Sequence, residues 1–201
     1  MRKSILVAAL PLLFLNVSCK KDTGTSETDV KKYDVKDFFD TRSVIGSGFN
    51  ADETKVLVTS NSSGIYNAYE VNIADTVARP LTNSAKESIF AESYLPNSSS
   101  FIYASDQGGD ENSHLYVFNQ TARKATDITP WAGSSNSFLG WSLDKKNLYL
   151  QSNKRDVKFF DIYKMDTLTW KPNLLYKNET GLEASRISPS ERYITLTKTI
   201  T

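Results

Sequence analysis

The sequence predicts an all-β fold, a partial β-propeller of about three four-stranded blades plus two strands of a fourth. Three recurring landmarks support this prediction. The first is a turn phrase whose leading apolar residues lie 45, 47 and 46 positions apart, at Phe49, Tyr94, Trp141 and Ile187. The other two recur every 47 positions: a strand that ends on Asn72, Asn119 and Asp166, and a later apolar residue at Leu81, Ile128 and Leu175. Such a period is typical of repeat architectures.

Each repeat unit divides into four strand-like runs separated by turn residues. In the second unit these runs cover roughly residues 89–94, 101–105, 114–119 and 124–129. Pro96 and Asn97 suit the first turn, because proline pre-sets φ and asparagine hydrogen-bonds the local backbone. Gly108 and Gly109 give the second connection the freedom that a reversal requires. The runs are rich in β-branched and aromatic residues, so each unit is predicted to be an antiparallel meander.

The second strand of each unit is a continuous apolar run, which indicates cover on both faces. These runs are Val56–Val58, Phe101–Tyr103 and Leu148–Leu150. Neighbouring blades of a propeller provide such cover. A β-sandwich is the alternative, and it predicts a similar strand spacing without a register shared by distant units. The shared register favours the propeller.

The number of units predicts an incomplete propeller. Three blades are expected at residues 42–82, 89–129 and 136–176, and residues 183–201 supply two strands of a fourth. Propellers typically close with about four to eight blades. We therefore expect residues 37–201 to be the incomplete propeller of a longer protein that continues beyond residue 201. The alternative is a half-propeller that closes by dimerising.

The first 18 residues have the layout of a secretory signal peptide. Arg2 and Lys3 form a positive region, and an apolar stretch follows from residue 5 to residue 15. This stretch is shorter than the about 20 residues that a membrane-spanning helix needs. We therefore expect residues 1–18 to be cleaved.

Residues 15–19, Leu-Asn-Val-Ser-Cys, resemble a bacterial lipobox, in which the cysteine is lipidated and becomes the new N-terminus. The resemblance implies that Cys19, the only cysteine, anchors the protein to a membrane of the bacterial cell envelope. Residues 19–36 begin with a polar stretch at residues 20–29, and the whole segment suits a tether between the anchor and the folded domain. The alternative is an ordinary signal peptide in which Cys19 has no special role.

The charge of the chain excludes a nucleic-acid-binding surface as its main function. The formal net charge is +1, and removing residues 1–18, which carry Arg2, Lys3 and no carboxylate, changes it to −1. Nucleic-acid-binding domains carry a clear basic excess. We therefore expect no nucleic-acid partner.

No arrangement of residues in the sequence predicts a catalytic site. An α/β-hydrolase requires a Gly-x-Ser-x-Gly elbow followed by an acid and a histidine. Residues 46–48, Gly-Ser-Gly, lack that spacing, and the only histidine, His114, begins a predicted strand. We interpret His114 as structural or solvent-facing. No catalytic residue, cofactor site or metal site is assigned to this chain.

The densest acidic group lies in the second connection of the second unit. It contains Asp106, Asp110, Glu111 and Asn112. Their side-chain oxygens suit calcium, but their order differs from that of an EF-hand loop. We interpret this segment as a hairpin loop and keep calcium binding as the alternative.

The same loop and the strands after it carry a family resemblance. Residues 105–112, Ser-Asp-Gln-Gly-Gly-Asp-Glu-Asn, with residues 115–119 and 127–130 after them, resemble the N-terminal propeller of prolyl oligopeptidase family serine peptidases. The similarity is greatest to the acylaminoacyl-peptidase and dipeptidyl-peptidase branches. It covers residues 37–201 and includes the Ile187–Ser190 phrase, which resembles a recurring Ser-Pro-Asp-Gly turn of the family.

This resemblance implies a function for a longer protein. In the family the propeller restricts access of small peptides to a C-terminal α/β-hydrolase domain, which holds the catalytic serine, aspartate and histidine. The expected function is therefore the substrate-access propeller of an envelope-anchored serine peptidase. Its expected partners are peptide substrates, through the hydrolase domain, and a membrane, through Cys19. The alternative is a non-enzymatic propeller lipoprotein resembling the periplasmic Tol-system propeller, which binds proteins or peptides.

Overall fold

The computed structural model describes residues 30–198, which divide into two compact units at Asp40 and Thr41. The described part of the first unit contains one short helix, α1 (Val35–Phe39), with exposed side chains. The Asp34 backbone N–H donates to Asp37 Oδ2 at 2.8 Å, which supports the first turn of α1. No helix among the described residues is long and apolar enough to cross a membrane.

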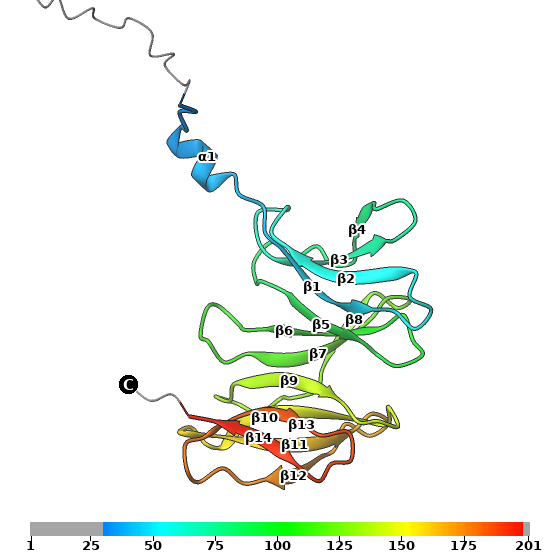
Figure 1. The fold of residues 1–201 in the computed structure, drawn as a ribbon, viewed down its shortest axis with the longest axis vertical. Helices are drawn as coiled ribbons and strands as arrows, with labels where there is room; N and C mark the ends of the chain where they lie inside the picture. Colours follow the sequence, from blue (N-terminus) through cyan, green and yellow to red (C-terminus); the bar gives the residue numbers. More distant parts are fainter. Residues whose placement is uncertain (1–29, 199–201) are drawn as a thin grey trace, which may run out of the picture. The chain divides into compact units, whose positions relative to one another are not determined.

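The second unit consists of antiparallel sheets whose strands pair in chain order (Figure 1). The first sheet contains β1 (Val44–Phe49), β2 (Lys55–Ser60), β3 (Asn67–Asn72) and β4 (Ala78–Pro80). The second contains β5 (Phe90–Tyr94), β6 (Phe101–Ser105), β7 (His114–Asn119) and β8 (Lys124–Asp127). The third contains β9 (Asn136–Trp141), β10 (Asn147–Asp156), β11 (Phe159–Asp166) and β12 (Pro172–Tyr176). Two further strands, β13 (Glu183–Ile187) and β14 (Ile194–Thr197), form a fourth sheet.

This arrangement confirms the predicted fold class of three four-stranded blades and two strands of a fourth. Successive sheets contact one another, and the first strand of each later sheet lies against the sheet before it. Within residues 30–198 the sheets do not form a closed propeller (Figure 1).

The recurring turn phrases form equivalent hairpins between the first and second strands of each sheet. In every hairpin the residue after the leading apolar residue donates its N–H to the carbonyl five residues later. The donor to acceptor pairs are Asn50 to Lys55 at 3.0 Å, Leu95 to Ser100 at 2.8 Å, Ser142 to Asn147 at 2.9 Å and Ser188 to Tyr193 at 2.9 Å. The sequence register therefore reflects the same closing hydrogen bond in four turns.

The second landmark has an equally local cause. The side chains of Asn72, Asn119 and Asp166 accept hydrogen bonds from backbone N–H groups in the turn after each third strand, at 2.8, 2.8 and 3.1 Å. Asparagine and aspartate stabilise such turns because their short polar side chains reach the backbone that follows.

The core lies between neighbouring sheets. One apolar cluster joins the first and second sheets around Leu57, Phe101 and Tyr103. Another joins the second and third sheets around Ile102, Leu148 and Leu150. Most residues of the predicted apolar runs are buried, so the expectation that these central strands are covered on both faces is confirmed.

Polar contacts between sheets accompany this apolar core. The Ala91 N–H on β5 donates to Thr59 Oγ1 on β2 at 2.8 Å, and Ser47 Oγ on β1 donates to the Ala91 carbonyl at 2.6 Å. Trp141 Nε1 on β9 donates to Ser93 Oγ on β5 at 2.9 Å. These bonds fix the first strands of the first three sheets relative to one another.

Candidate functional site: a pocket along the first strands

The first strand of every sheet contains a β-bulge at an equivalent position. The register shifts between Gly46 and Gly48, between Ala91 and Ser93, opposite Tyr149 and Leu150, and between Ala184 and Arg186. The extra residues are Ser47, Glu92, Leu139 and Ser185, each two positions before the leading apolar residue of a turn phrase. Because a bulge redirects a side chain, these four positions set what each first strand presents at its surface.

Two of the bulge residues, Ser47 and Glu92, line a pocket of about 530 Å³ where β1, β5 and β9 approach one another. Other parts of its lining are apolar, such as Ile45 and Phe90. The remaining polar lining is uncharged and comes from Thr59, Ser113, Ser135, Asn136 and Ser137. The pocket therefore combines many hydroxyl groups with one carboxylate.

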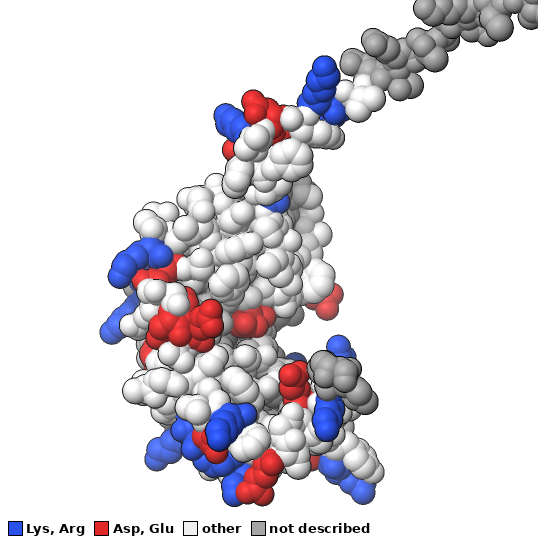
Figure 2. All heavy atoms as spheres, turned by 90° about the vertical axis from the view of Figure 1, so that its left-hand side faces the viewer, with Lys and Arg blue, Asp and Glu red and all other residues white. Residues whose placement is uncertain are grey.

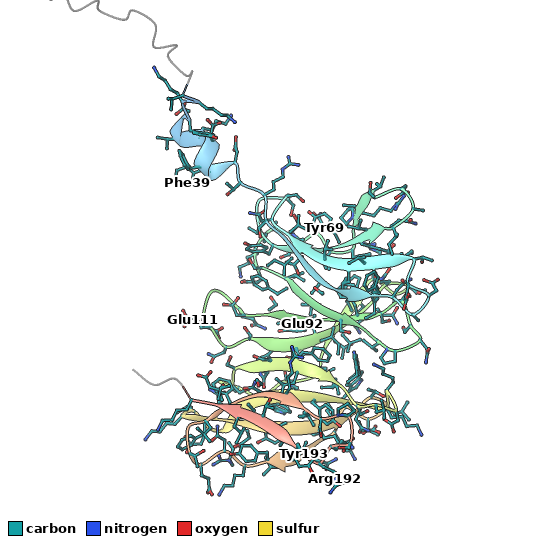
Figure 3. The ribbon with its side chains drawn as sticks, in the orientation of Figure 1. Phe39, Tyr69, Glu92, Glu111, Arg192 and Tyr193 are labelled. Carbon is teal, nitrogen blue, oxygen red and sulfur yellow. The ribbon has the colours of Figure 1, made fainter. Side chains whose placement is uncertain are left out.

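The carboxyl group of Glu92 has an unusual environment. Its side chain is half-buried, and among residues 30–198 no cationic group lines the pocket with it. Burial raises the pKa of Glu92 from its ordinary value of 4.5 to about 7. The carboxyl group thus titrates near neutral pH, whereas an exposed glutamate is fully ionised there. Figure 3 shows Glu92 among the stacked sheets and Glu111 out on the loop between β6 and β7.

Asn136 adds a buried acceptor to the same region. It is 1% exposed, and its Nδ2 group donates to the Ser113 carbonyl at 3.0 Å and to Ser134 Oγ at 3.1 Å. Its Oδ1 atom accepts no hydrogen bond from the described part of the chain. A buried polar atom without a partner is uncommon in folded proteins.

The acidic loop of the second sheet is stabilised mainly by its own backbone. Asp110 Oδ1 accepts from the Asn112 N–H at 3.0 Å, and this bond, followed by the Asn112 side-chain bond, lowers the pKa of Asp110. Gly108, at φ 68°, donates its N–H to Glu87 Oε2 at 2.9 Å, which ties the loop to the segment between the first two sheets. Among residues 30–198 no three His, Cys, Asp or Glu side chains are grouped to hold a metal ion. The hydrogen bonds of Asp110 and Gly108 are those of a hairpin connection, and calcium binding is left untested.

His114 occupies a structural position. Its Nδ1 atom lies 2.8 Å from Asp127 Oδ2, so it ties the third strand of its sheet to the end of the fourth. The equivalent residues 47 positions away on either side, Asn67 and Asp161, also bond to the end of the fourth strand or just beyond it. Ser47 donates to the backbone carbonyl of Ala91 and not to His114, so Ser47 and His114 do not form a nucleophile and base pair.

Cys19 lies outside the described residues, and its lipidation remains a prediction.

The sequence alone did not single out Glu92 or Asn136. The available signal was the position of Glu92 two residues before Tyr94, which Ser47, Leu139 and Ser185 share in their own units. No residue composition marks a bulge, and the burial of Glu92 depends on three sheets meeting around it.

Charge elsewhere on the surface is mixed. Figure 2 shows Lys, Arg, Asp and Glu side chains scattered among uncharged residues on the face that it displays. Ion pairs such as Lys164 with Glu191, at 2.7 Å, place both signs side by side.

Comparison with known proteins identifies the family. The pattern of the dipeptidyl peptidase IV (DPP IV) N-terminal region matches residues 49–199, about three quarters of the chain. The chain belongs to the DPP IV N-terminal region family. The matched residues include the bulged first strands and the turn phrases of the sheets. The predicted resemblance to prolyl oligopeptidase family propellers is therefore confirmed.

Named relatives of this DPP IV N-terminal region include a peptidase. The chain is 32% identical over 108 residues to dipeptidyl aminopeptidase BIII of Pseudoxanthomonas mexicana, a match covering 52% of this chain and 15% of that protein. Among solved structures, TolB from Acinetobacter baumannii matches 77% of this chain and 37% of its own, with a TM-score of 0.61 and 16% identity. A prolyl endopeptidase structure matches 78% and 26%, with a TM-score of 0.54 and 13% identity. At these identities the structural matches establish the fold alone.

Proposed function

We propose that this chain is the substrate-access propeller of a longer serine peptidase that cleaves small peptides. The family match over residues 49–199 carries the proposal, because that family is defined on the N-terminal region of a peptidase. The 32% identity to dipeptidyl aminopeptidase BIII supports it further. In this proposal the catalytic serine, aspartate and histidine belong to an α/β-hydrolase domain that follows residue 201.

The pocket on the first strands suits a substrate-access role. In a propeller the first strands of the blades lie nearest the central axis, so β1, β5 and β9 would line the route of a peptide. The hydroxyl groups and backbone around Ser47, Glu92 and Asn136 offer hydrogen-bonding partners to a polar peptide chain.

The second proposal concerns location. Cys19 and the residues after it support a lipid-anchored protein of the bacterial cell envelope, because residues 15–19 resemble a lipobox at the end of a signal peptide. Metabolic labelling with a palmitate analogue is expected to mark the native chain and leave Cys19→Ser unlabelled and in the soluble fraction. Ser18→Ala is the control and should keep both the label and membrane association. Equal labelling of the native chain and Cys19→Ser would contradict the anchor.

A non-enzymatic propeller is the second candidate function. The TolB structures of Acinetobacter baumannii and Agrobacterium tumefaciens have TM-scores of 0.61 and 0.59, above the 0.54 of the prolyl endopeptidase structure. The TM-scores compare shape alone, because the identities are 16% or less, and they do not distinguish the two functions. The family match over residues 49–199 favours the peptidase.

Translation of the gene downstream of codon 201 distinguishes the two candidates. The peptidase proposal predicts three to five further blades and then a Gly-x-Ser-x-Gly elbow. A stop codon directly after the last blade would refute it and favour a TolB-like binding protein. Residues 1–201 alone are expected to hydrolyse no peptide p-nitroanilide.

A further inference from the structure

A second cavity lies between the β4–β5 connection and the second sheet. Its volume is about 600 Å³, and its lining comes from that connection, from β6 and β7, and from the start of the loop between them. It shares no lining residue with the pocket along the first strands. The substrate-access function proposed above makes no use of this cavity.

One wall of the cavity is the end of a row of aromatic rings on the second sheet. Phe101 on β6 lies opposite Phe118 on β7, with ring centroids 5.2 Å apart. The next such pair, Tyr103 and Tyr116, stacks at 5.0 Å with the ring planes 12° apart. Tyr103 is 7% exposed, whereas Tyr116 is half-buried and keeps ring surface that a ligand can cover. Such a ring offers a flat apolar surface to the face of another ring.

The rest of the lining is rich in hydrogen-bonding groups of both kinds. Asp106 and Glu87 supply carboxylate acceptors, and the side chains of Gln107 and Ser84 can both donate and accept. The half-buried carboxylate of Asp106 accepts one hydrogen bond from the described chain, from the Glu111 N–H at 3.4 Å. Most of its acceptor capacity therefore remains for a ligand.

Two hydrogen bonds hold the walls of the cavity together. The Gly108 N–H donates to Glu87 Oε2 at 2.9 Å, and Ser105 Oγ donates to the Ser88 carbonyl at 2.8 Å. Both bonds join the β4–β5 connection to the second sheet or its loop. The cavity is therefore formed before any ligand enters, which lowers the entropic cost of binding.

We propose that this cavity binds a pyranose sugar. The C–H face of the sugar ring covers the open surface of Tyr116. Its hydroxyl groups, which both donate and accept, bond to Asp106 and Gln107, and two adjacent hydroxyl groups can donate to the two oxygens of one carboxylate. The volume lies within the range of small-molecule sites. The inference does not rest on the proposed function, because such a site would exist with or without peptidase activity.

The charge of the lining argues against other flat ligands. One lysine, Lys86, and two carboxylates, Glu87 and Asp106, give it a net formal charge of −1. Lys86 is already paired with Glu87 at 3.4 Å, so a nucleotide phosphate would meet an unpaired negative charge. An aromatic side chain of another protein would cover Tyr116 but leave Asp106 without a donor. A neutral ligand with many hydroxyl groups satisfies both walls.

The test measures sugar binding by the full gene product, using saturation-transfer-difference NMR titrations. The probes are the methyl β-glycosides of glucose, galactose and N-acetylglucosamine, and the chain forms cellotriose and chitotriose. Sorbitol, which has hydroxyl groups but no ring, and N-acetyltyrosinamide, which has a ring but few polar groups, are the control probes. We expect at least one glycoside to bind with a Kd of about 1–10 mM, about tenfold tighter than either control probe. Tighter binding of the corresponding trisaccharide identifies a glycan chain as the source, and equal affinities identify a free sugar.

Variants assign the binding to this cavity. Tyr116→Leu removes the ring and should weaken binding about tenfold, whereas Tyr116→Phe keeps the ring and should bind like the native chain. Asp106→Asn should weaken binding about fivefold, because hydrogen bonds to a charged acceptor are the stronger ones. Tyr193→Leu, at an exposed tyrosine of the fourth sheet, and Glu111→Gln, at an exposed carboxylate outside the lining, should leave binding unchanged.

Circular dichroism and thermal melting show whether each variant is folded. The inference is overturned if no sugar binds more tightly than sorbitol, or if N-acetyltyrosinamide binds more tightly than every sugar. Native affinity in both folded Tyr116→Leu and folded Asp106→Asn would equally overturn it. Peptide hydrolysis by the same protein is a separate readout, so the proposed function stands or fails independently.

Discussion

Thr59 illustrates how single side chains join the sheets. It is 1% exposed, and its Oγ1 atom accepts the Ala91 N–H from the next sheet at 2.8 Å. Thr59→Val keeps the shape of the side chain and strands that buried N–H group. We expect a loss of about 1–3 kcal/mol in the free energy of unfolding, measured by urea denaturation.

Thr126→Val is the matched control for this loss. Thr126 is exposed on β8, so the same substitution there should change stability by less than about 0.5 kcal/mol. Equal effects at the two positions would show that the bond between the sheets contributes nothing measurable.

Glu92 should make stability depend on pH. Its pKa in the folded chain, about 7, exceeds the ordinary value of 4.5, so the folded state holds the proton more tightly than the unfolded state. The resulting stabilisation is complete below about pH 4.5 and is lost as the pH rises through about 7. Relative to the native chain, Glu92→Gln should therefore gain roughly 2 kcal/mol between pH 5 and pH 8, a figure reduced for partial solvent exposure.

Urea unfolding at both pH values measures this gain, and Glu111→Gln corrects for the loss of one carboxylate. A Glu92→Gln variant with the same pH dependence as the native chain would mean that the Glu92 carboxyl group is not desolvated.

At the level of single residues, the sequence predicted which apolar side chains are buried, because the continuous apolar runs of the strands mark them directly. It did not predict Glu92, because that burial arises from residues on three separate strands.

At the scale of elements, the turn between the first and second strands is the most regular feature of the chain. Each of the four turns places a non-glycine residue at positive φ: Glu53 at 59°, Asn97 at 54°, Lys145 at 60° and Glu191 at 57°. This conformation costs an L-residue other than glycine about 1–2 kcal/mol. The turn is therefore maintained by its hydrogen bonds against a local conformational cost.

Replacing Lys145 with glycine should remove that cost. We expect Lys145→Gly to raise the free energy of unfolding by roughly 0.5–1 kcal/mol, after the greater entropy of glycine in the unfolded chain is included. Lys146→Gly, one residue later at ordinary φ, should lower it by about the same amount. Thermal melting of both variants measures the difference, and a loss of stability in both would show that the positive φ carries no strain.

The elements were largely predictable because their turn chemistry is local. Asn72, Asn119 and Asp166 mark the ends of third strands through bonds to the residues that follow them directly. The bulges were not predictable, since an extra residue in a strand changes pairing without changing composition. Helix α1 was also missed, because its five residues are too few to show a helical period and lie where a polar tether was expected to meet the domain.

At the scale of the whole molecule, the repeat and the family agree. Three four-stranded sheets and a two-stranded sheet follow the sequence period, and residues 49–199 match the DPP IV N-terminal region. The period of the landmarks indicated the architecture, and the loop at residues 105–112 indicated the family. The candidate pocket is a product of the assembled sheets, since its lining comes from segments between residues 45 and 137 that only the fold brings together.

The proposed function makes this propeller part of a serine peptidase. The most direct measurement is hydrolysis of peptide p-nitroanilides by the full gene product, before and after treatment with a serine-directed fluorophosphonate. We expect turnover that disappears in proportion to the labelling of one serine beyond residue 201. A folded full-length product that neither cleaves these peptides nor takes up the label would contradict it.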